Sequence, residues 1–220
     1  MKKMNKYKYL SYFLDDKTPL YGGKKGISIN KIDDISNGDT ANTKKISMHN
    51  HSGTHIDFPN HFFDDGKVSS DYDPNFWVFE NPFMLNIKAK ENQIICLDSS
   101  DLNKIPRETD FLILNTGFYR FRRLKKYWNN NPGIHPDLAS MLKERCPNLK
   151  ILGMDFISLT SYQHRALGKV AHREFLGNNE ILLVEDMKLD ELKKSPSRII
   201  CLPILIRDVD GCPVTILAED

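Results

Sequence analysis

Residues 47–63, SMHNHSGTHIDFPNHFF, constrain the fold more than any other stretch, because four of the seven histidines fall there. Pro59 and Gly53 disfavour a helix, since proline removes a hydrogen-bond donor and clashes with the preceding turn. In an extended chain, side chains alternate between two faces. The pattern therefore predicts a metal-binding face whose opposite side enters the core. The donors of the first face are His49, His51, His55, Asp57 and His61, and the apolar residues of the second are Met48, Ile56 and Phe58.

If the chain between His51 and His55 were a straight strand, these two residues would be badly placed to bind one ion. Their Cα atoms would lie about 13 Å apart at roughly 3.3 Å per residue. Two imidazoles that each bind an ion at about 2.1 Å barely reach across that gap. We therefore expect a bend at Gly53, which tolerates unusual backbone angles. Asp57, two residues beyond His55, then reaches the same ion.

The composition of the whole chain is that of an ordinary globular protein. Its 220 residues are 40% hydrophobic and 27% charged, so we expect one domain over residues 1–220, with residues 1–8 flexible. The formal net charge of +2 implies neither nucleic acid nor a membrane as partner. The basic N-terminus lacks the apolar run of a signal peptide, and the four cysteines show no paired spacing. A cytoplasmic location is the expectation.

Short apolar runs outnumber helical patterns along the chain. HPDLASMLKER (135–145) has helical spacing after an early proline, and residues 161–176 are helical or irregular. Residues 198–206 and 213–219 form a predicted terminal strand pair around an Asp-Gly turn. This pattern predicts an α/β fold with a mixed, largely antiparallel sheet. Its other predicted strands are 84–88, 94–97, 110–115, 149–155 and 181–187.

The run HSGTHIDFPNHF matches the H-x-G-T-H-x-D-x-P-x-H-F signature of the metal-dependent cyclase family without a gap. That family includes bacterial kynurenine formamidases and isatin hydrolases. Other segments resemble the family more loosely: TPLYGG, NTGFY, GMDFIS, HREFL with ILLVEDMKL, and VDGCPV. Thr215 departs from the pattern, because many formamidases carry an arginine there. The resemblance implies a swivelling β/β/α-type domain that assembles as a homodimer or higher homo-oligomer.

The resemblance also implies roles for individual residues. His51, His55 and Asp57 would hold one metal ion, and Asp57 would bridge to a second ion held by His172 and Glu185. His172 is preferred to His164, because it begins HREFL, and Glu185 is preferred to Asp186, because it continues the apolar run ILLV. His61 would be the catalytic acid–base group, with a further metal ligand as its alternative role. Candidate substrate-binding residues are Tyr21, Phe62 and Trp77.

Imidazole and carboxylate ligands without cysteine suit zinc, or else manganese, with one or two ions per chain. Such an ion acidifies water and polarises a carbonyl, and a histidine moves protons near neutral pH. Together with the resemblance to kynurenine formamidases, this chemistry leads us to expect a hydrolase that cleaves the C–N bond of a small amide, such as the aryl formamide N-formylkynurenine. Hydrolysis of a cyclic amide, or cyclisation, on the same centre is the alternative, and a non-catalytic metal-binding scaffold is another.

A function of a different class rests on the segment YRFRRLKKYW (119–128). Basic residues interleaved with aromatic ones can bind phosphates and stack on bases. The simpler interpretation is a solvated surface segment, which the near-neutral charge of the chain favours. We therefore expect a small-molecule substrate, without nucleic acid or membrane partners.

Overall fold

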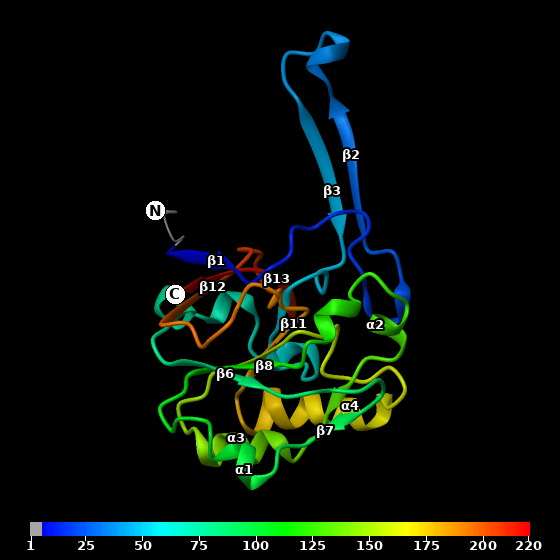
Figure 1. Ribbon diagram of the computed structural model, residues 1–220. Helices are drawn as coiled ribbons and strands as arrows, with labels where there is room; N and C mark the ends of the chain where they lie inside the picture. The colour runs from blue at the N-terminus through cyan, green and yellow to red at the C-terminus, as the bar shows by residue number, and fades with distance from the viewer. Residues whose placement is uncertain (1–5) are drawn as a thin grey trace, which may run out of the picture.

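A mixed sheet of nine strands forms the centre of the computed structural model, which describes residues 6–220 (Figure 1). The strand order is β5-β12-β13-β4-β11-β10-β8-β6, and β1 pairs with β13 beside this path. The α/β class with a mixed sheet is thus confirmed. The strands are β1 (Tyr7–Tyr9), β4 (His55–Asp57), β5 (Val78–Phe79), β6 (Pro82–Asn86), β8 (Phe111–Asn115), β10 (Ile151–Met154), β11 (Leu182–Glu185), β12 (Arg198–Pro203) and β13 (Gly211–Glu219).

Strands β6, β8, β10 and β11 form the parallel part of the sheet. The runs FLILN, ILGM and LLVE lack polar alternation because parallel strands are covered on both faces. Helices α3 (Leu138–Arg145) and α4 (Arg165–Arg173) lie below the sheet in Figure 1. A π-helical turn, Glu174–Asn178, continues α4. Shorter elements outside the main sheet include α1 (Ser99–Leu102), α2 (Lys126–Asn129), and the small parallel pair β7 (Ile94–Ile95) with β9 (Gly133–Ile134).

The antiparallel part begins at β4, which lies between β11 and β13. In register, His55 stands between Glu185 on one side and Pro213 on the other, and Asp57 lies between Leu183 and Gly211. The predicted terminal pair exists as β12 and β13, paired antiparallel. The parallel strands end and β4 begins at the same edge, where ligand sites commonly form in α/β sheets.

The histidine-rich stretch is not one extended strand. Its first residues end a hairpin of β2 (Ile27–Asp33) and β3 (Thr43–Met48), which projects far from the sheet in Figure 1. Residues 49–54 turn, and Gly53 adopts a φ of 66°, so the expected bend is present. Because of this turn, the predicted alternation holds within β4, where Ile56 is buried, but not for His49, which is exposed.

The predicted flexibility of residues 1–8 mostly concerns residues outside the described range. Tyr7 and Lys8 are an exception, because they belong to β1 and pair with Glu219 and Ala218 of β13. Backbone pairing with a long strand holds these two residues in place.

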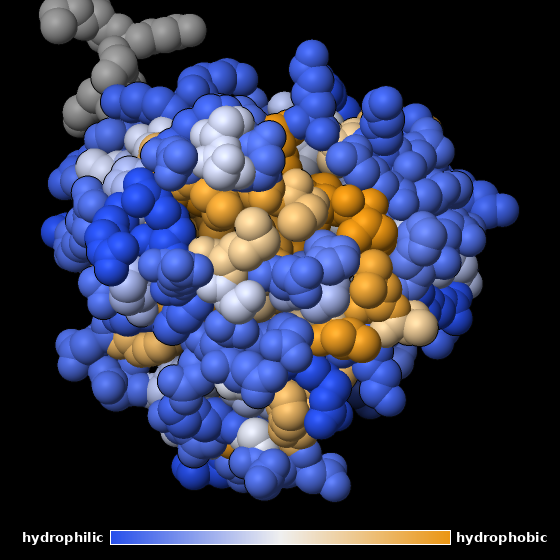
Figure 2. All heavy atoms as spheres, turned by 90° about the horizontal axis from the view of Figure 1, so that it is seen from below, coloured by the Kyte–Doolittle hydropathy of each residue, from blue (hydrophilic) through white to orange (hydrophobic). Residues whose placement is uncertain are grey.

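The face below the sheet, seen in Figure 2, is hydrophilic around its edge, with hydrophobic residues gathered at its centre. The core covers both faces of the sheet, because Phe111 and Ile113 point to one face of β8 and Leu112 to the other, and all three are fully buried. Within residues 6–220, no helix has the length and apolar character needed to span a bilayer.

Candidate metal centre

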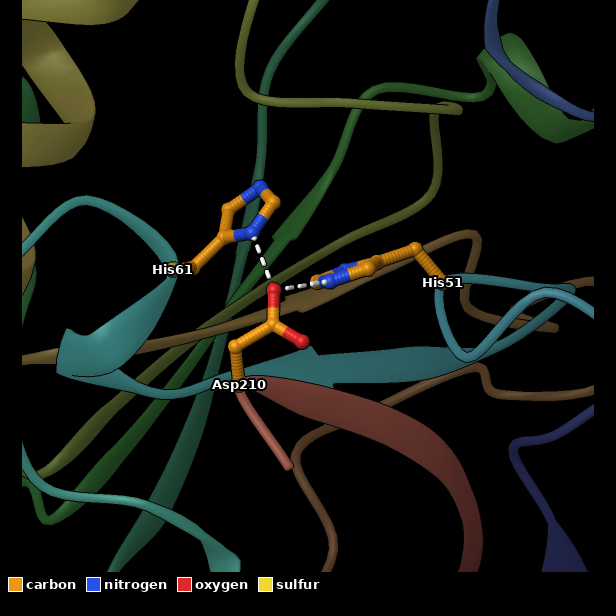
Figure 3. Close-up of side chains that lie close together, drawn as sticks. All are labelled: His51, His61 and Asp210. Atoms are coloured by element: carbon orange, nitrogen blue, oxygen red, sulfur yellow. Dashed lines mark hydrogen bonds and ion pairs between the residues drawn. The ribbon is translucent and has the colours of Figure 1, made fainter. Parts of the chain in front are cut away.

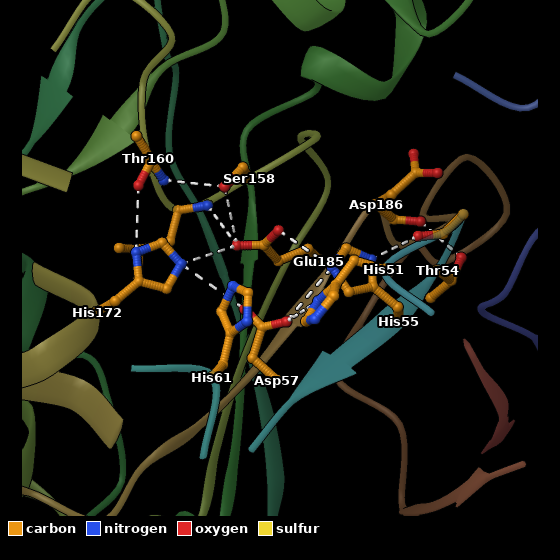
Figure 4. A network of polar contacts seen from close by, with 12 residues as sticks. His51, Thr54, His55, Asp57, His61, Ser158, Thr160, His172, Glu185 and Asp186 are labelled. Carbon is orange, nitrogen blue, oxygen red and sulfur yellow. Dashed lines mark hydrogen bonds and ion pairs between the residues drawn. The ribbon is translucent and has the colours of Figure 1, made fainter. Parts of the chain in front are cut away.

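Five polar side chains converge at the edge where β4 meets β11 (Figure 4). They form two groups of potential metal donors that share Asp57. The donor atoms of each group lie within 4.8 Å of one another. One group is His51, His55 and Asp57, and the other is Asp57, His172 and Glu185. Four of the five residues are buried, and His51 is half-buried.

The spacing of the donor atoms of His55 and His172 fits metal ligation better than direct hydrogen bonding, whereas His51 Nδ1 lies within hydrogen-bond distance of Asp57. His55 Nε2 lies 3.4 Å from an oxygen of Asp57 and 3.4 Å from one of Glu185. His172 Nε2 lies 3.7 and 3.6 Å from the same two carboxylates. These separations are long for hydrogen bonds. Two ligands that each bind a tetrahedral ion at about 2.1 Å stand about 3.4 Å apart. The residues therefore fit a divalent ion.

Backbone carbonyls orient the two buried imidazoles. Nδ1 of His55 bonds to the carbonyl of Gly53 at 2.8 Å, and Nδ1 of His172 bonds to that of Gly168 at 2.8 Å. A carbonyl accepts only from an N–H, so Nδ1 carries a proton in each ring, and Nε2 is the nitrogen left to bind an ion between the carboxylates. Such a partner on the remote nitrogen is typical of metal-binding histidines.

The carboxylates are held as firmly as the imidazoles. Oε1 of Glu185 accepts the backbone N–H of Leu159 at 2.7 Å and the Ser158 hydroxyl at 3.2 Å. Oδ1 of Asp57 bonds to His51 Nδ1 at 2.8 Å, whereas its Oδ2 faces His172. One oxygen of Asp57 is thus directed toward each group, as a bridging ligand requires.

The electrostatics of the cluster favour a cation. Burial raises the pKa of both Asp57 and Glu185, and the charge of Asp57 raises that of Glu185 further, but the neighbouring histidines outweigh these effects and hold both pKa values below the ordinary range. Burial likewise opposes charge on His51 and His172, yet their carboxylate partners raise each pKa to about 9. Buried carboxylates need positive partners. Protonated imidazoles or a metal ion meet that need.

A third group, His51, His61 and Asp210, lies beside the first (Figure 3). Oδ2 of Asp210 bonds to His51 Nε2 at 2.9 Å and to His61 Nδ1 at 2.7 Å. Hydrogen bonds from His51 and His61 lower the pKa of Asp210, despite the opposing effect of burial. One carboxylate therefore orients a candidate ligand and the candidate base, and the second nitrogen of His61, Nε2, points away from it.

The glycine after this aspartate has a steric role. A Cβ at Gly211 would lie 2.3 Å from Cε1 of His51, so only glycine lets the imidazole pack against the start of β13. Sequence reasoning noted VDGCPV only as a resemblance and gave Asp210 no role. The Asp-Gly pair at the start of a strand was its only local signal, and the contact joins residues 159 positions apart.

A cavity of about 350 Å³ opens onto the metal-donor cluster. Two of the predicted substrate residues, Tyr21 and Phe62, line it, as do Ile157 and Arg165. Phe62 stacks on His172 with ring centroids 4.5 Å apart. Trp77 is not brought to the cavity: it is 4% exposed and packs edge-on against Phe58 in the core.

The remaining sequence candidates fall outside the cluster. His164 is exposed at the start of α4, whereas His172, two turns later, occupies the buried face of that helix with Ala171. Asp186 is buried but bonds to other partners than the donors, as described below. Thr215 is exposed on β13 and does not line the cavity. A larger cavity of about 740 Å³ contains none of the five donors.

Comparison with known proteins places these features in a family. A family model described as putative cyclase matches residues 9–160. The chain belongs to this family. The match includes His51, His55, Asp57 and His61 but ends before His172, Glu185 and Asp210. The resemblance seen in the signature run is thus confirmed, and the second half of the site is placed by the structure.

Several relatives are similar over most of the chain. Cyclase-like protein 3 of Arabidopsis thaliana is 29% identical over 187 residues, which cover 81% of this chain and 66% of that protein. A kynurenine formamidase of Geobacillus thermodenitrificans is 28% identical over 211 residues, covering 96% of both. Isatin hydrolase A from Labrenzia aggregata, solved with benzyl benzoate, aligns with a TM-score of 0.79 at 20% identity, over 96% of this chain and 92% of that one. At that identity the structural likeness establishes the fold.

Proposed function

We propose that this chain is a metal-dependent hydrolase that cleaves the C–N bond of a small amide, with an aryl formamide such as N-formylkynurenine as the favoured substrate. The observation that carries the proposal is the pair of donor groups that share Asp57 at the wall of the 350 Å³ cavity. A cavity of that size suits a small molecule. The similarity to a kynurenine formamidase over 96% of both chains supports the choice of substrate.

The donors favour zinc, with manganese as the second choice, because three imidazoles and two carboxylates contain no thiolate. His51, His55 and Asp57 would hold one ion, and Asp57, His172 and Glu185 would hold the other if two bind. The chemistry that such an ion supplies when bound is polarisation of a carbonyl and acidification of water.

His61 supplies the proton transfer in this proposal. It lines the cavity, and Asp210 holds its Nδ1, which leaves Nε2 as the acceptor. Nε2 takes a proton from the attacking water and returns it to the departing nitrogen, so that the amine leaves neutral. A carboxylate behind a histidine fixes its tautomer and stabilises the imidazolium that forms. The 2.7 Å contact to Asp210 provides this support.

The remaining walls of the cavity suit an aromatic amide with a polar substituent. Phe62 and Tyr21 offer ring faces, and the hydroxyl of Tyr21 is buried without a hydrogen-bond partner within residues 6–220. Arg165 lies at the cavity with its guanidinium 4.0 Å from the Tyr162 ring centroid. We assign the hydroxyl and the guanidinium to a carboxylate-bearing side chain of the substrate, which N-formylkynurenine carries.

The alternatives rest on fewer observations. Hydrolysis of a cyclic amide, or cyclisation, would use the same donors and differ only in how the substrate fits the cavity. A nucleic-acid module loses a key residue, because Arg122 of the basic segment is buried against Asp186 rather than exposed. The Asp210–His61 hydrogen bond beside the donors argues against a non-catalytic scaffold, because metal binding alone does not require it.

One preparation tests the proposal. Protein purified without chelator should contain one to two divalent ions per chain, as the two donor groups require. It should hydrolyse aryl formamides in a panel that also holds isatin, other lactams and peptides. The hydrolase proposal would be rejected if the purified protein contained no divalent metal and could not be loaded with one. It would also be rejected if the metal-loaded protein hydrolysed nothing in the panel. Turnover of lactams alone would move the assignment to cyclic amides.

We also propose that the chain forms a homodimer or higher homo-oligomer. The β2–β3 hairpin exposes the paired Ile29 and Ile46, and a lone two-stranded hairpin is marginal in water. A second copy that covers this pair would stabilise it. Light scattering should give a mass above that of one chain, and Ile46→Lys should reduce it to that of one chain. A cytoplasmic location stays a prediction, in keeping with four unpaired cysteines.

A further inference from the structure

Asp186 follows the candidate ligand Glu185 directly, yet it belongs to a separate buried network. Its carboxylate accepts hydrogen bonds from two nitrogens of Arg122: Nε donates to Oδ1 at 2.8 Å and to Oδ2 at 3.1 Å, and Nη2 donates to Oδ2 at 2.6 Å. The Tyr127 hydroxyl also donates to Oδ1, at 2.6 Å. The side chains of Asp186 and Arg122 are 0% and 7% exposed. None of these three residues lines the cavity, so none contacts a substrate.

The backbone of Asp186 ties this network to the strand that carries the other donors. Its carbonyl accepts the Thr54 hydroxyl at 2.6 Å, and Thr54 directly precedes His55. Thr54 Oγ1 in turn accepts the N–H of Tyr12 at 3.1 Å, and the Tyr12 ring lies 3.8 Å from the Arg122 guanidinium. These contacts close a ring, which we name the Asp186 cluster: Tyr12, Thr54, Arg122, Tyr127 and Asp186.

Two features of the Asp186 cluster oppose the stability of the folded state, so stabilisation alone does not account for it. Asp186 adopts a φ of 54°, a left-handed conformation that strains a residue other than glycine. A buried ion pair commonly contributes little net stability, because removing both charges from water offsets their attraction. Strain and buried charge are thus concentrated where two donor-bearing strands meet. Their effect there is to fix the position of Thr54 relative to Asp186, and with it that of His55 relative to Glu185.

We propose that the Asp186 cluster is a positioning device that sets the 3.4 Å spacing between His55 Nε2 and Glu185, and thereby the metal affinity of the site. The inference rests on the proposed metal-dependent function. Arg122, Tyr127 and Asp186 act through Glu185 and His55, not on the substrate. The basic segment 119–128 then has a structural reason for its arginine and tyrosine, which hold the end of β11 from the side away from the cavity.

Three variants and a matched control test it. Asp186→Asn keeps the shape and tolerates the left-handed backbone, Arg122→Met removes the fork of donors, and the double variant measures their coupling. Arg145→Met is the control, because Arg145 is a half-buried arginine that binds the carbonyls of Leu102 and Ile105 far from the donors. Melting temperature, zinc affinity by competition, the Co²⁺ absorption spectrum, and KM and kcat are measured where every variant is folded.

Asp186→Asn and Arg122→Met should each weaken zinc binding about 10- to 100-fold, as loss of residues behind metal ligands does. The Co²⁺ spectrum should change, kcat should fall more than KM rises, and the double variant should be little worse than either single one. Arg145→Met should lose melting temperature without these changes. Variants that lose only stability, like the control, overturn the proposal.

The same measurements separate this inference from the proposed function. A wild-type protein that binds zinc but hydrolyses no amide rejects the hydrolase, while the affinity comparison still decides the role of the Asp186 cluster. A wild-type protein that binds no divalent metal rejects both, because there is then no site to position.

Discussion

Asp210 bonds to His61 Nδ1 at 2.7 Å through the same oxygen that contacts His51. One carboxylate thereby joins the candidate base to a candidate ligand. Asp210→Asn presents a weaker acceptor and can offer an N–H, which favours the wrong tautomer of His61. We expect kcat for an aryl formamide to fall on the order of 10²-fold, with KM little changed. Steady-state kinetics measures both.

Asn50 provides the control for that variant, since it donates to the other oxygen of Asp210 at 2.6 Å. Asn50→Ala keeps the carboxylate and both imidazole contacts, so its kcat should stay within a few-fold of wild type. Wild-type kcat in Asp210→Asn would show that the contact orients nothing that matters in turnover.

His61→Ala separates proton transfer from metal binding. His61 belongs to neither donor group that contains Asp57, so the variant should keep its full metal content. Its kcat should fall about 10²- to 10⁴-fold, the range for loss of a general acid–base group. Metal analysis and kinetics on one preparation test both statements. His49→Ala, on an exposed histidine of the same stretch, should change neither. Loss of metal in His61→Ala would instead make it a ligand.

His172 and His164 lie on one helix, which makes them a matched pair. His172 faces the carboxylates of Asp57 and Glu185, whereas His164 is exposed. His172→Ala should lower the number of zinc ions bound per chain, or their affinity, and should reduce the zinc-induced rise in melting temperature, because a ligand that binds more tightly stabilises the folded state more. His164→Ala should behave as wild type. Equal metal loss in both variants would reject the assignment of the distal ligand.

Arg165→Met tests how the cavity receives the substrate. A partly exposed charge pair contributes about 1 kcal/mol, so KM for a carboxylate-bearing aryl formamide should rise about fivefold. KM for neutral formanilide should not change. Lys104→Met, at an exposed lysine that does not line the cavity, should affect neither substrate. An equal effect of Arg165→Met on both substrates would mean that Arg165 shapes the cavity without pairing with the carboxylate.

Local sequence rules predicted the part of the site in residues 49–61 well. Proline and glycine there excluded a helix, and the distance between His51 and His55 in a straight strand required the bend that Gly53 makes at φ 66°. Ile56, opposite the donors of β4, is buried as alternation predicts. These features depend on neighbours in sequence, which is why the chain alone reveals them.

The remaining residues of the site, which come from later in the chain, depend on the register between distant segments. Asp210 reaches His51 only because Gly211 pairs with Asp57 when β13 joins β4. Arg122 is buried because it pairs with the buried carboxylate of Asp186, 64 residues later in the chain. Composition alone predicted an exposed basic segment instead. Trp77 was assigned to the pocket by residue type, but the aromatic cluster with Phe58 and Phe76 holds it in the core.

The position of β4 has a consequence for the order of assembly. Both of its neighbours, β11 and β13, come more than a hundred residues later in the chain. During synthesis, the signature histidines therefore emerge long before any strand exists to pair with them. Such non-local pairing slows folding. The candidate donors of β4 and β11 meet when these two strands pair, but Asp210 reaches His51 and His61 only when β13 docks, so the candidate site is complete only after that step.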